Sequence, residues 1–252
     1  MRRIRRSFKR VIALLLDAMS RLVTARSPAA KHVIVLGDSF ASAYGVSAEQ
    51  SWGAIYADRL RCELANLAIE GATSDALINR TYTWPSGRSQ SQLAEALSLV
   101  DEAPSGNVRA VAVGVGINDW LWLQDPETSE RCAVVWTAAC DDLFTASLES
   151  LGDNLNKILS DLQSALEPGT HLIVMTYCMV WNVDKSDAVN SVILSAIGQH
   201  ADAILADLRE PFAGREDVLL QDTVHPSVAG HTVIAGVFSN VTPPVPNSTT
   251  AS

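Results

Sequence analysis

The sequence predicts an α/β fold in which helices cover both faces of a parallel sheet. Five short apolar segments alternate along the chain with longer segments that repeat apolar residues every three to four positions, as helices do. The short segments are rich in Val, Ile, Leu and Ala without polar alternation, which is typical of parallel strands buried on both faces. We therefore expect a doubly wound, three-layer sandwich around a central sheet of about five strands.

The expected elements follow one another in alternation. Each strand is an apolar run bounded by turn residues, and the strands cover residues 32–37, 63–69, 108–116, 171–178 and 203–208. Each helix has the apolar period of one buried face, and the helices cover residues 49–61, 90–100, 145–166, 187–200 and 227–238. The segment 120–142 holds three tryptophans and two cysteines and is too long for a minimal turn. We expect this segment to form a lid or one wall of a pocket.

The length and composition predict one domain with two tails. The chain has 252 residues, of which 48% are hydrophobic, and it contains no linker near its middle. We assign residues 31–240 to the folded domain and residues 1–30 to a separate basic segment. Residues 241–252 are rich in Pro, Ser and Thr and are expected to be disordered.

The charge is distributed unevenly. Residues 1–31 carry nine Lys and Arg against one Asp, whereas the remaining residues carry ten basic and 27 acidic side chains, so the two parts have net charges of +8 and −17. A domain this negative repels phosphate backbones, and nucleic acid is therefore excluded as a partner.

The basic segment has two interpretations. Residues 5–9 read Arg-Arg-Ser-Phe-Lys before an apolar run at 11–16, which resembles a twin-arginine export signal with a cleavage site at 23–25. This predicts an exported protein, periplasmic or extracellular. Alternatively, residues 4–22 form a basic amphipathic helix on an anionic membrane surface, which predicts a membrane-peripheral or cytoplasmic protein. Because no apolar run approaches 18 residues, we expect no transmembrane span.

The four cysteines do not form a metal or redox motif. None belongs to a C-x-x-C pair, so neither a zinc site nor a redox site is indicated. Cys132 and Cys140 have a spacing suited to a disulfide if the protein is exported. Cys178 ends an apolar strand and is expected to be a buried free thiol.

Three residues at opposite ends of the chain indicate acyl-transfer chemistry. Ser39 follows the first strand in the tight turn Gly-Asp-Ser, and this places its hydroxyl at the carboxyl edge of the sheet, where such folds bind ligands. Asp222 lies three residues before His225, so one loop can carry both side chains. A serine, an imidazole and a carboxylate are the groups that covalent acyl transfer needs. The sequence therefore predicts a serine esterase.

The donors for an oxyanion follow later strands. In α/β-hydrolases the nucleophile sits in G-x-S-x-G after an upstream strand has supplied an oxyanion loop, but position 41 is Ala and no such strand precedes Ser39. Gly71 follows the second expected strand and Asn118 follows the third. Together with the Ser39 N–H, the Gly71 N–H and the Asn118 amide give three donors at one edge of the sheet.

Four motif blocks resemble the GDSL, or SGNH, family of esterases and lipases. The blocks are GDSF at 37–40, Gly71, GIND at 116–119 and DTVHP at 222–226, in that order. Residues 44–52 are similar to the exported thioesterase and lysophospholipase branch, although the long 120–170 stretch departs from the family. The resemblance implies the SGNH, flavodoxin-like sandwich. It also implies Ser39 as nucleophile, His225 as base and then acid, Asp222 as its orienting carboxylate, and an oxyanion hole of Ser39, Gly71 and Asn118.

The predicted reaction is hydrolysis of a carboxylic ester or thioester, such as a lipid, a lysophospholipid or a small acyl ester. An O-acyltransferase or carbohydrate O-deacetylase with the same site is one alternative, and an inactive binding module is another. We expect no metal and no cofactor, and a monomer. Asp38 and Asp119 are interpreted as structural hydrogen-bonding residues and not as acids. His231 is also interpreted as structural, because no third metal ligand accompanies His225 and His231.

Overall fold

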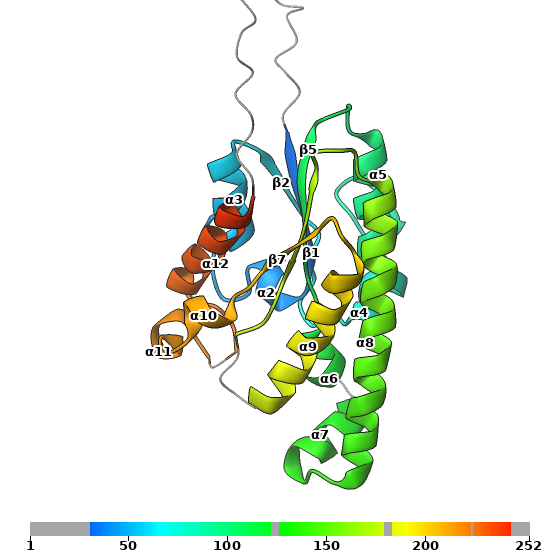
Figure 1. Cartoon of the computed structure of the whole chain (residues 1–252), viewed down its shortest axis with the longest axis vertical. Helices are drawn as coiled ribbons and strands as arrows, with labels where there is room; N and C mark the ends of the chain where they lie inside the picture. Colours follow the sequence, from blue (N-terminus) through cyan, green and yellow to red (C-terminus); the bar gives the residue numbers. More distant parts are fainter. Residues whose placement is uncertain (1–30, 122–125, 179–182, 223, 243–252) are drawn as a thin grey trace, which may run out of the picture. The chain divides into compact units, whose positions relative to one another are not determined.

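The computed structural model describes residues 31–121, 126–178, 183–222 and 224–242. The expectations for residues 1–30, and for all but the first two residues of the 241–252 tail, fall outside these ranges. A central sheet of five parallel strands lies between two layers of helices (Figure 1). The predicted three-layer α/β fold class is therefore confirmed.

The five strands are arranged in the order β2-β1-β5-β6-β7. Their bounds are β1 (His32–Gly37), β2 (Glu63–Asn66), β5 (Val108–Gly114), β6 (His171–Met175) and β7 (Ala203–Ala206). The chain moves outward from β1 to β2 and then crosses back to β5, so the direction of winding reverses between β1 and β5. Folds of this kind bind ligands at that reversal, beyond the carboxyl ends of the strands.

Four of the five strands, β2, β5, β6 and β7, end earlier than the apolar pattern predicts. Strand β2 ends at Asn66, whose side chain donates to Ala41 O and accepts from Ala68 N at 2.9 and 3.0 Å. After Asn66 the backbone still runs beside β1, because Leu67 N and Ile69 N donate to Val35 O and Gly37 O at 2.8 and 3.0 Å. Strand β5 ends at Gly114, and Gly116, two residues later, has φ +141°, which favours glycine.

The helices form one layer on each face. Helices α3 (Trp52–Leu60) and α12 (Val228–Val241) pack on one face. The other face is covered by α4 (Ser74–Asn79), α5 (Gln92–Glu102), α8 (Ala138–Ala165) and α9 (Val183–Gln199). Among the described residues, no helix has the length and apolarity needed to cross a bilayer.

Short elements connect the layers, and the sequence pattern did not predict them. They are α2 (Ser39–Ser42), η1 (Ala48–Gln50), α6 (Ile117–Leu121), α7 (Pro126–Val134), α10 (Arg209–Phe212), α11 (Glu216–Leu219) and the hairpin of β3 (Tyr82–Thr83) and β4 (Ser89–Gln90). Most of them have too few residues to show a period.

Helix α12 is attached to α3 by three specific contacts. The Trp52 N–H donates to His231 Nδ1 at 3.1 Å, and the Trp52 ring stacks on Phe238 with centroids 4.3 Å apart. The hydroxyls of Tyr56 and Thr242 share a hydrogen bond of 2.6 Å. Burial lowers the pKa of His231 to about 4, so the ring is neutral, as a structural acceptor requires. These contacts hold α12 against α3 from its first turn to its C-cap, and so fix the point where the preceding loop ends.

The segment 120–142 is largely helical. It contains the end of α6, all of α7 and the first turn of α8, which begins at Ala138, seven residues before the predicted start. The predicted disulfide between Cys132 and Cys140 is present and joins α7 to α8. Cys178 is a buried free thiol, as expected, and burial raises its pKa.

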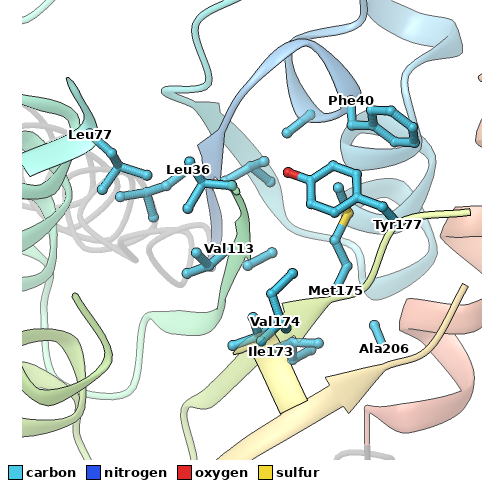
Figure 2. Packing of buried hydrophobic residues seen from close by; sticks show 14 of the residues in the cluster. Leu36, Phe40, Leu77, Val113, Ile173, Val174, Met175, Tyr177 and Ala206 are labelled. Carbon is cyan, nitrogen blue, oxygen red and sulfur yellow. The ribbon is translucent and has the colours of Figure 1, made fainter. Parts of the chain in front are cut away.

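The hydrophobic core continues from the sheet to the carboxyl end of β1. Figure 2 shows Leu36 and Val113 beside side chains of β6, with the rings of Phe40 and Tyr177 at one end of this cluster. These two rings meet edge to face with centroids 5.0 Å apart. Because Phe40 and Tyr177 are fully buried, the turn that carries Ser39 rests on close-packed atoms.

Candidate active site

The turn after β1 depends on a glycine. Gly37 has φ +148°, and a Cβ at this position would overlap the carbonyl oxygen of Gly114. The fully buried Gln92 holds both backbone groups of Gly37: its Oε1 accepts from Gly37 N at 2.9 Å and its Nε2 donates to Gly37 O at 3.1 Å. Asp38 N then donates to Gly114 O at 3.0 Å. The position of the next residue, Ser39, is therefore set by β1, β5 and α5 together.

Ser39 is the first residue of α2, and its hydroxyl does not cap that helix. Asp38 is the N-cap, and its Oδ1 accepts from Phe40 N at 2.9 Å. The Ser39 hydroxyl instead forms a 2.9 Å hydrogen bond with His225 Nε2. The side chain is thus available for chemistry, although Ser39 as a whole is only 8% exposed.

His225 joins Ser39 to Asp222. The imidazole Nδ1 lies 2.7 Å from Asp222 Oδ2, and Asp222 Oδ1 accepts from the backbone N–H of His225 at 2.6 Å. Because an ionised carboxylate only accepts hydrogen bonds, Nδ1 carries the proton, and Nε2 is left to accept the Ser39 hydroxyl proton. The expected carboxylate, imidazole and hydroxyl therefore form one line of hydrogen bonds.

The environment of Asp222 favours its ionised form. Partial burial raises the pKa of this carboxyl, but the backbone and side-chain hydrogen bonds from His225 outweigh it and bring the pKa below its usual value. A group that stays ionised beside the imidazole can stabilise the positive charge that develops when His225 accepts a proton.

Asp38 has the opposite environment. Its carboxyl is fully buried, and this burial raises its pKa to about 7, against the lowering effect of hydrogen bonds from the Tyr177 hydroxyl and Phe40 N. Tyr177 donates to Asp38 Oδ2 at 2.6 Å from the end of β6. Both carboxyl oxygens of Asp38 therefore accept hydrogen bonds from buried groups of the fold. This agrees with the interpretation of Asp38 as a structural residue.

The three expected oxyanion donors follow three neighbouring strands. Ser39 follows β1, Gly71 follows β2 and Asn118 lies in α6 after β5. The Asn118 amide is buried and donates one N–H to Ala72 O at 3.1 Å, which holds it against the residue next to Gly71. Within the described ranges, the backbone N–H groups of Ser39 and Gly71 have no acceptor. These groups are therefore free to bind a negative oxygen.

Asp119 forms its side-chain hydrogen bonds with α4, as its interpretation as a structural residue predicts. Asn118 and Asp119 are adjacent residues of the short helix α6. Asp119 accepts from Ser74 N at 3.0 Å and also from the Ser74 hydroxyl, which itself accepts from Asn154. Burial raises the pKa of Asp119 to about 6. Asp119 thus fastens α4 to α6.

The Asp207 carboxylate is hydrogen-bonded by Thr176 and Arg209. Its Oδ1 accepts from the Thr176 hydroxyl at 3.0 Å, and Arg209 pairs with both carboxyl oxygens. The hydrogen bond from Arg209 lowers the pKa of Asp207 to about 2. Asp207 is therefore no partner of His225, and the choice of Asp222 agrees with the geometry.

Sequence reasoning missed four residues that support these groups. They are Gln92 at Gly37, Tyr177 at Asp38, and Tyr44 and Gln221 around His225. Gln221 precedes a predicted residue, but nothing in its local sequence marks it. Each of the four acts across a long sequence separation, so a motif search along one segment does not reveal it.

Comparison with protein families finds one match over most of the chain. The model of the GDSL-like Lipase/Acylhydrolase family matches residues 35–233, a range that contains Ser39, Gly71, Asn118, Asp222 and His225. No curated protein matches the chain in sequence.

Several solved structures share the fold. They include a lipase, Lip_vut3, from a goat rumen metagenome (16% identity, TM-score 0.60, covering 84% of this chain and 97% of that one). Phospholipase A1 from Streptomyces albidoflavus NA297 aligns with 17% identity and a TM-score of 0.59, and an extracellular lipase from Streptomyces rimosus with 20% and 0.58; each covers 84% of this chain and 100% of its own. At these identities the likeness is one of fold.

The raised pKa of Asp38 predicts a pH-dependent stability difference. A carboxyl whose pKa is about 7 when folded and near 3.8 when unfolded binds more protons in the folded state between these values. The wild type should therefore lose stability relative to D38N as the pH rises from about 4 to 7, because Asn keeps a partner for Tyr177 and does not ionise. The measurement is the Tm of both proteins across this range. A constant Tm difference would contradict the buried, protonated carboxyl.

Proposed function

We propose that this chain, which belongs to the GDSL-like Lipase/Acylhydrolase family, hydrolyses a carboxylic ester or thioester through an acyl-enzyme intermediate on Ser39. Membership of the family makes the chain an ester hydrolase with a small-molecule ester as substrate. The role of Ser39 is supported by the two hydrogen bonds that run from Asp222 through His225 to its hydroxyl. As the substrate we propose a lipid, a lysophospholipid or a small acyl ester.

The first half of the reaction acylates the serine. Ser39 Oγ attacks the carbonyl carbon of the ester while its proton moves to His225 Nε2, 2.9 Å away in the free enzyme. Asp222 accepts from Nδ1–H throughout and stabilises the imidazolium without taking the proton. The tetrahedral intermediate then collapses, and the alcohol or thiol leaves with the proton from His225.

Water completes the second half by the same steps. His225 removes a proton from a water molecule, whose oxygen attacks the acyl carbon, and the proton returns to Ser39 Oγ as the carboxylic acid leaves. In both halves the carbonyl oxygen becomes negative. We assign its stabilisation to Ser39 N–H, Gly71 N–H and the second N–H of the Asn118 amide, because the first is used by Ala72 O.

We also propose that the folded domain functions outside the reducing cytosol. The disulfide between Cys132 and Cys140 supports this proposal, since such bonds persist in oxidising compartments. The test is the mass of the mature protein purified from cells that produce it. Cleavage near Arg26 would support export by a cleaved signal, and a full-length chain would contradict such a signal.

Replacement of the nucleophile should abolish turnover without unfolding the protein. S39A removes the Oγ atom, and the Gly37 turn and the Asp38 cap that shape this segment use none of that atom's bonds. A fluorophosphonate probe should label wild type at Ser39 and leave S39A unlabelled, while the two proteins have similar circular dichroism. Labelling of another residue, or no labelling of wild type, would overturn the acyl-Ser39 mechanism.

Loss of the Asn118 amide should affect the transition state. N118A should lower kcat by about 10²–10³, the usual loss for one oxyanion donor. KM should change little, because the negative oxygen does not exist in the bound substrate. The matched control is N79A, which removes an exposed amide from α4. An effect of N118A that is confined to KM would reassign this residue to substrate binding.

The carboxylate that orients His225 should be identified by comparing two Asp→Asn variants. D222N should lower kcat by up to about 10⁴, the loss measured for the equivalent change in one well-studied triad. D207N should stay near wild type, because Asp207 pairs with Arg209 and Thr176. Steady-state rates on one activated ester decide the question. An active D222N beside a crippled D207N would disprove this assignment.

A further inference from the structure

An aromatic ring covers one face of the His225 imidazole. The centroids of the Tyr44 and His225 rings lie 4.1 Å apart and their planes differ by 36°. Tyr44 is 40% exposed, and within the described part of the chain its hydroxyl makes no hydrogen bond. The ring contact is therefore the interaction that this side chain makes at the site, and the mechanism above does not use it.

The Tyr44 turn is shaped to present that ring. Ala43 and Gly45, which flank Tyr44, have φ values of +78° and +75°. Two left-handed residues around one position form a tight turn, and for Ala this conformation costs free energy that other contacts must offset.

Gln221 supplies such contacts and joins the turn to the His225 loop. Its Nε2 donates to Tyr44 O at 3.0 Å, and its backbone N–H donates to His225 O at 2.9 Å. The missing side chain of Gly45 leaves the space that the Gln221 amide fills, since a Cβ there would overlap the amide. A single residue thus connects the backbone of Tyr44 with the backbone of His225.

The imidazole needs a contact of this kind. The hydrogen bonds of His225 to Asp222 and Ser39 both act at the edge of the ring, so they leave its faces unsupported. The Asp222 side chain is 43% exposed, and water competes with its bond to His225. The Tyr44 ring, 4.1 Å away between centroids and tilted by 36°, limits movement of the imidazole and excludes water from that side. It also attracts the positive charge that the imidazole gains in the reaction, because the face of an aromatic ring is negative.

We propose that Tyr44 is a positioning residue for His225, acting through the face of its ring and held in place by Gln221. This inference rests on the proposed function, because it requires His225 to take the proton of Ser39. The ring, and not the hydroxyl, carries the effect. Tyr44 therefore contributes equally to the reaction of every ester and of a phosphonate probe.

The test compares ring removal with ring retention. Y44L removes the ring and Y44F retains it. Y82L makes the same Tyr→Leu change in the β3–β4 hairpin, where the ring centroids of Tyr82 and Trp84 lie 5.7 Å apart. For each protein we would measure kcat and KM on p-nitrophenyl acetate and p-nitrophenyl octanoate, and the second-order rate of labelling by a small fluorophosphonate. Circular dichroism and Tm report folding.

Y44L should lower kcat on both esters and the labelling rate by a common factor of about 3–10, the range expected from one aromatic pair. KM should change by less than about twofold. Y44F should recover most of the lost rate, and Y82L should match wild type. If Y44L does not fold, Q221A provides the same readouts, and it should lower both rates because it releases the Tyr44 turn.

Three results would overturn the inference. Labelling of Y44L at the wild-type rate would show that the ring does not act through His225. A loss that is confined to KM, or that differs between acetate and octanoate, would make Tyr44 a substrate contact. A loss in Y44F equal to that in Y44L would assign the effect to the hydroxyl. Absence of labelling in wild type would instead overturn the Ser39 mechanism itself, so the two failures are distinguishable.

Discussion

The close approach of β1 and β5 at their carboxyl ends is the constraint on which the site depends. Gly37 lies opposite Gly114 in the sheet, and only a residue without a side chain fits there with φ +148°. The chain can therefore leave the sheet abruptly where the direction of winding reverses, and Ser39 begins a helix two residues later. Asn118 follows the partner strand from the same edge. The spacing between Ser39 and Asn118 is thus set by the packing of backbone in the sheet, which is stiffer than a loop.

The site separates its carboxyl groups by environment. Asp38 and Asp119 are buried, accept hydrogen bonds from fixed neighbours and have raised pKa values, whereas Asp222 is partly exposed and stays ionised through its bonds to His225. Burial therefore reduces the negative charge that Asp38 and Asp119 carry near neutral pH. The ionised carboxylate of Asp222 lies beside Nδ1 of the imidazole, where it can stabilise a cation.

Ser39, Asp222 and His225 could be predicted from the sequence because each is marked by a short local motif. A strand followed by Gly-Asp-Ser places Ser39, and a three-residue spacing pairs Asp222 with His225. The supporting residues could not be predicted, because Gln221 meets Tyr44 across 177 positions and Gln92 meets Gly37 across 55. The five strands are evident from composition, but four of them end earlier than the apolar pattern predicts. The segment 120–142 is expected to form a lid or one wall of a pocket because it is too long for a minimal turn, and its helices are too short to show a clear period.

The separation of 186 positions between Ser39 and His225 has a consequence for the timing of activity. During synthesis all five strands are made before His225, since the last of them, β7, ends at Ala206. The imidazole can meet the Ser39 hydroxyl only after the loop before α12 has been made and α12 has docked on α3 through Trp52 and Phe238. Under the proposed mechanism, a chain that stops after β7 contains every strand of the sheet and still lacks the base that the reaction needs.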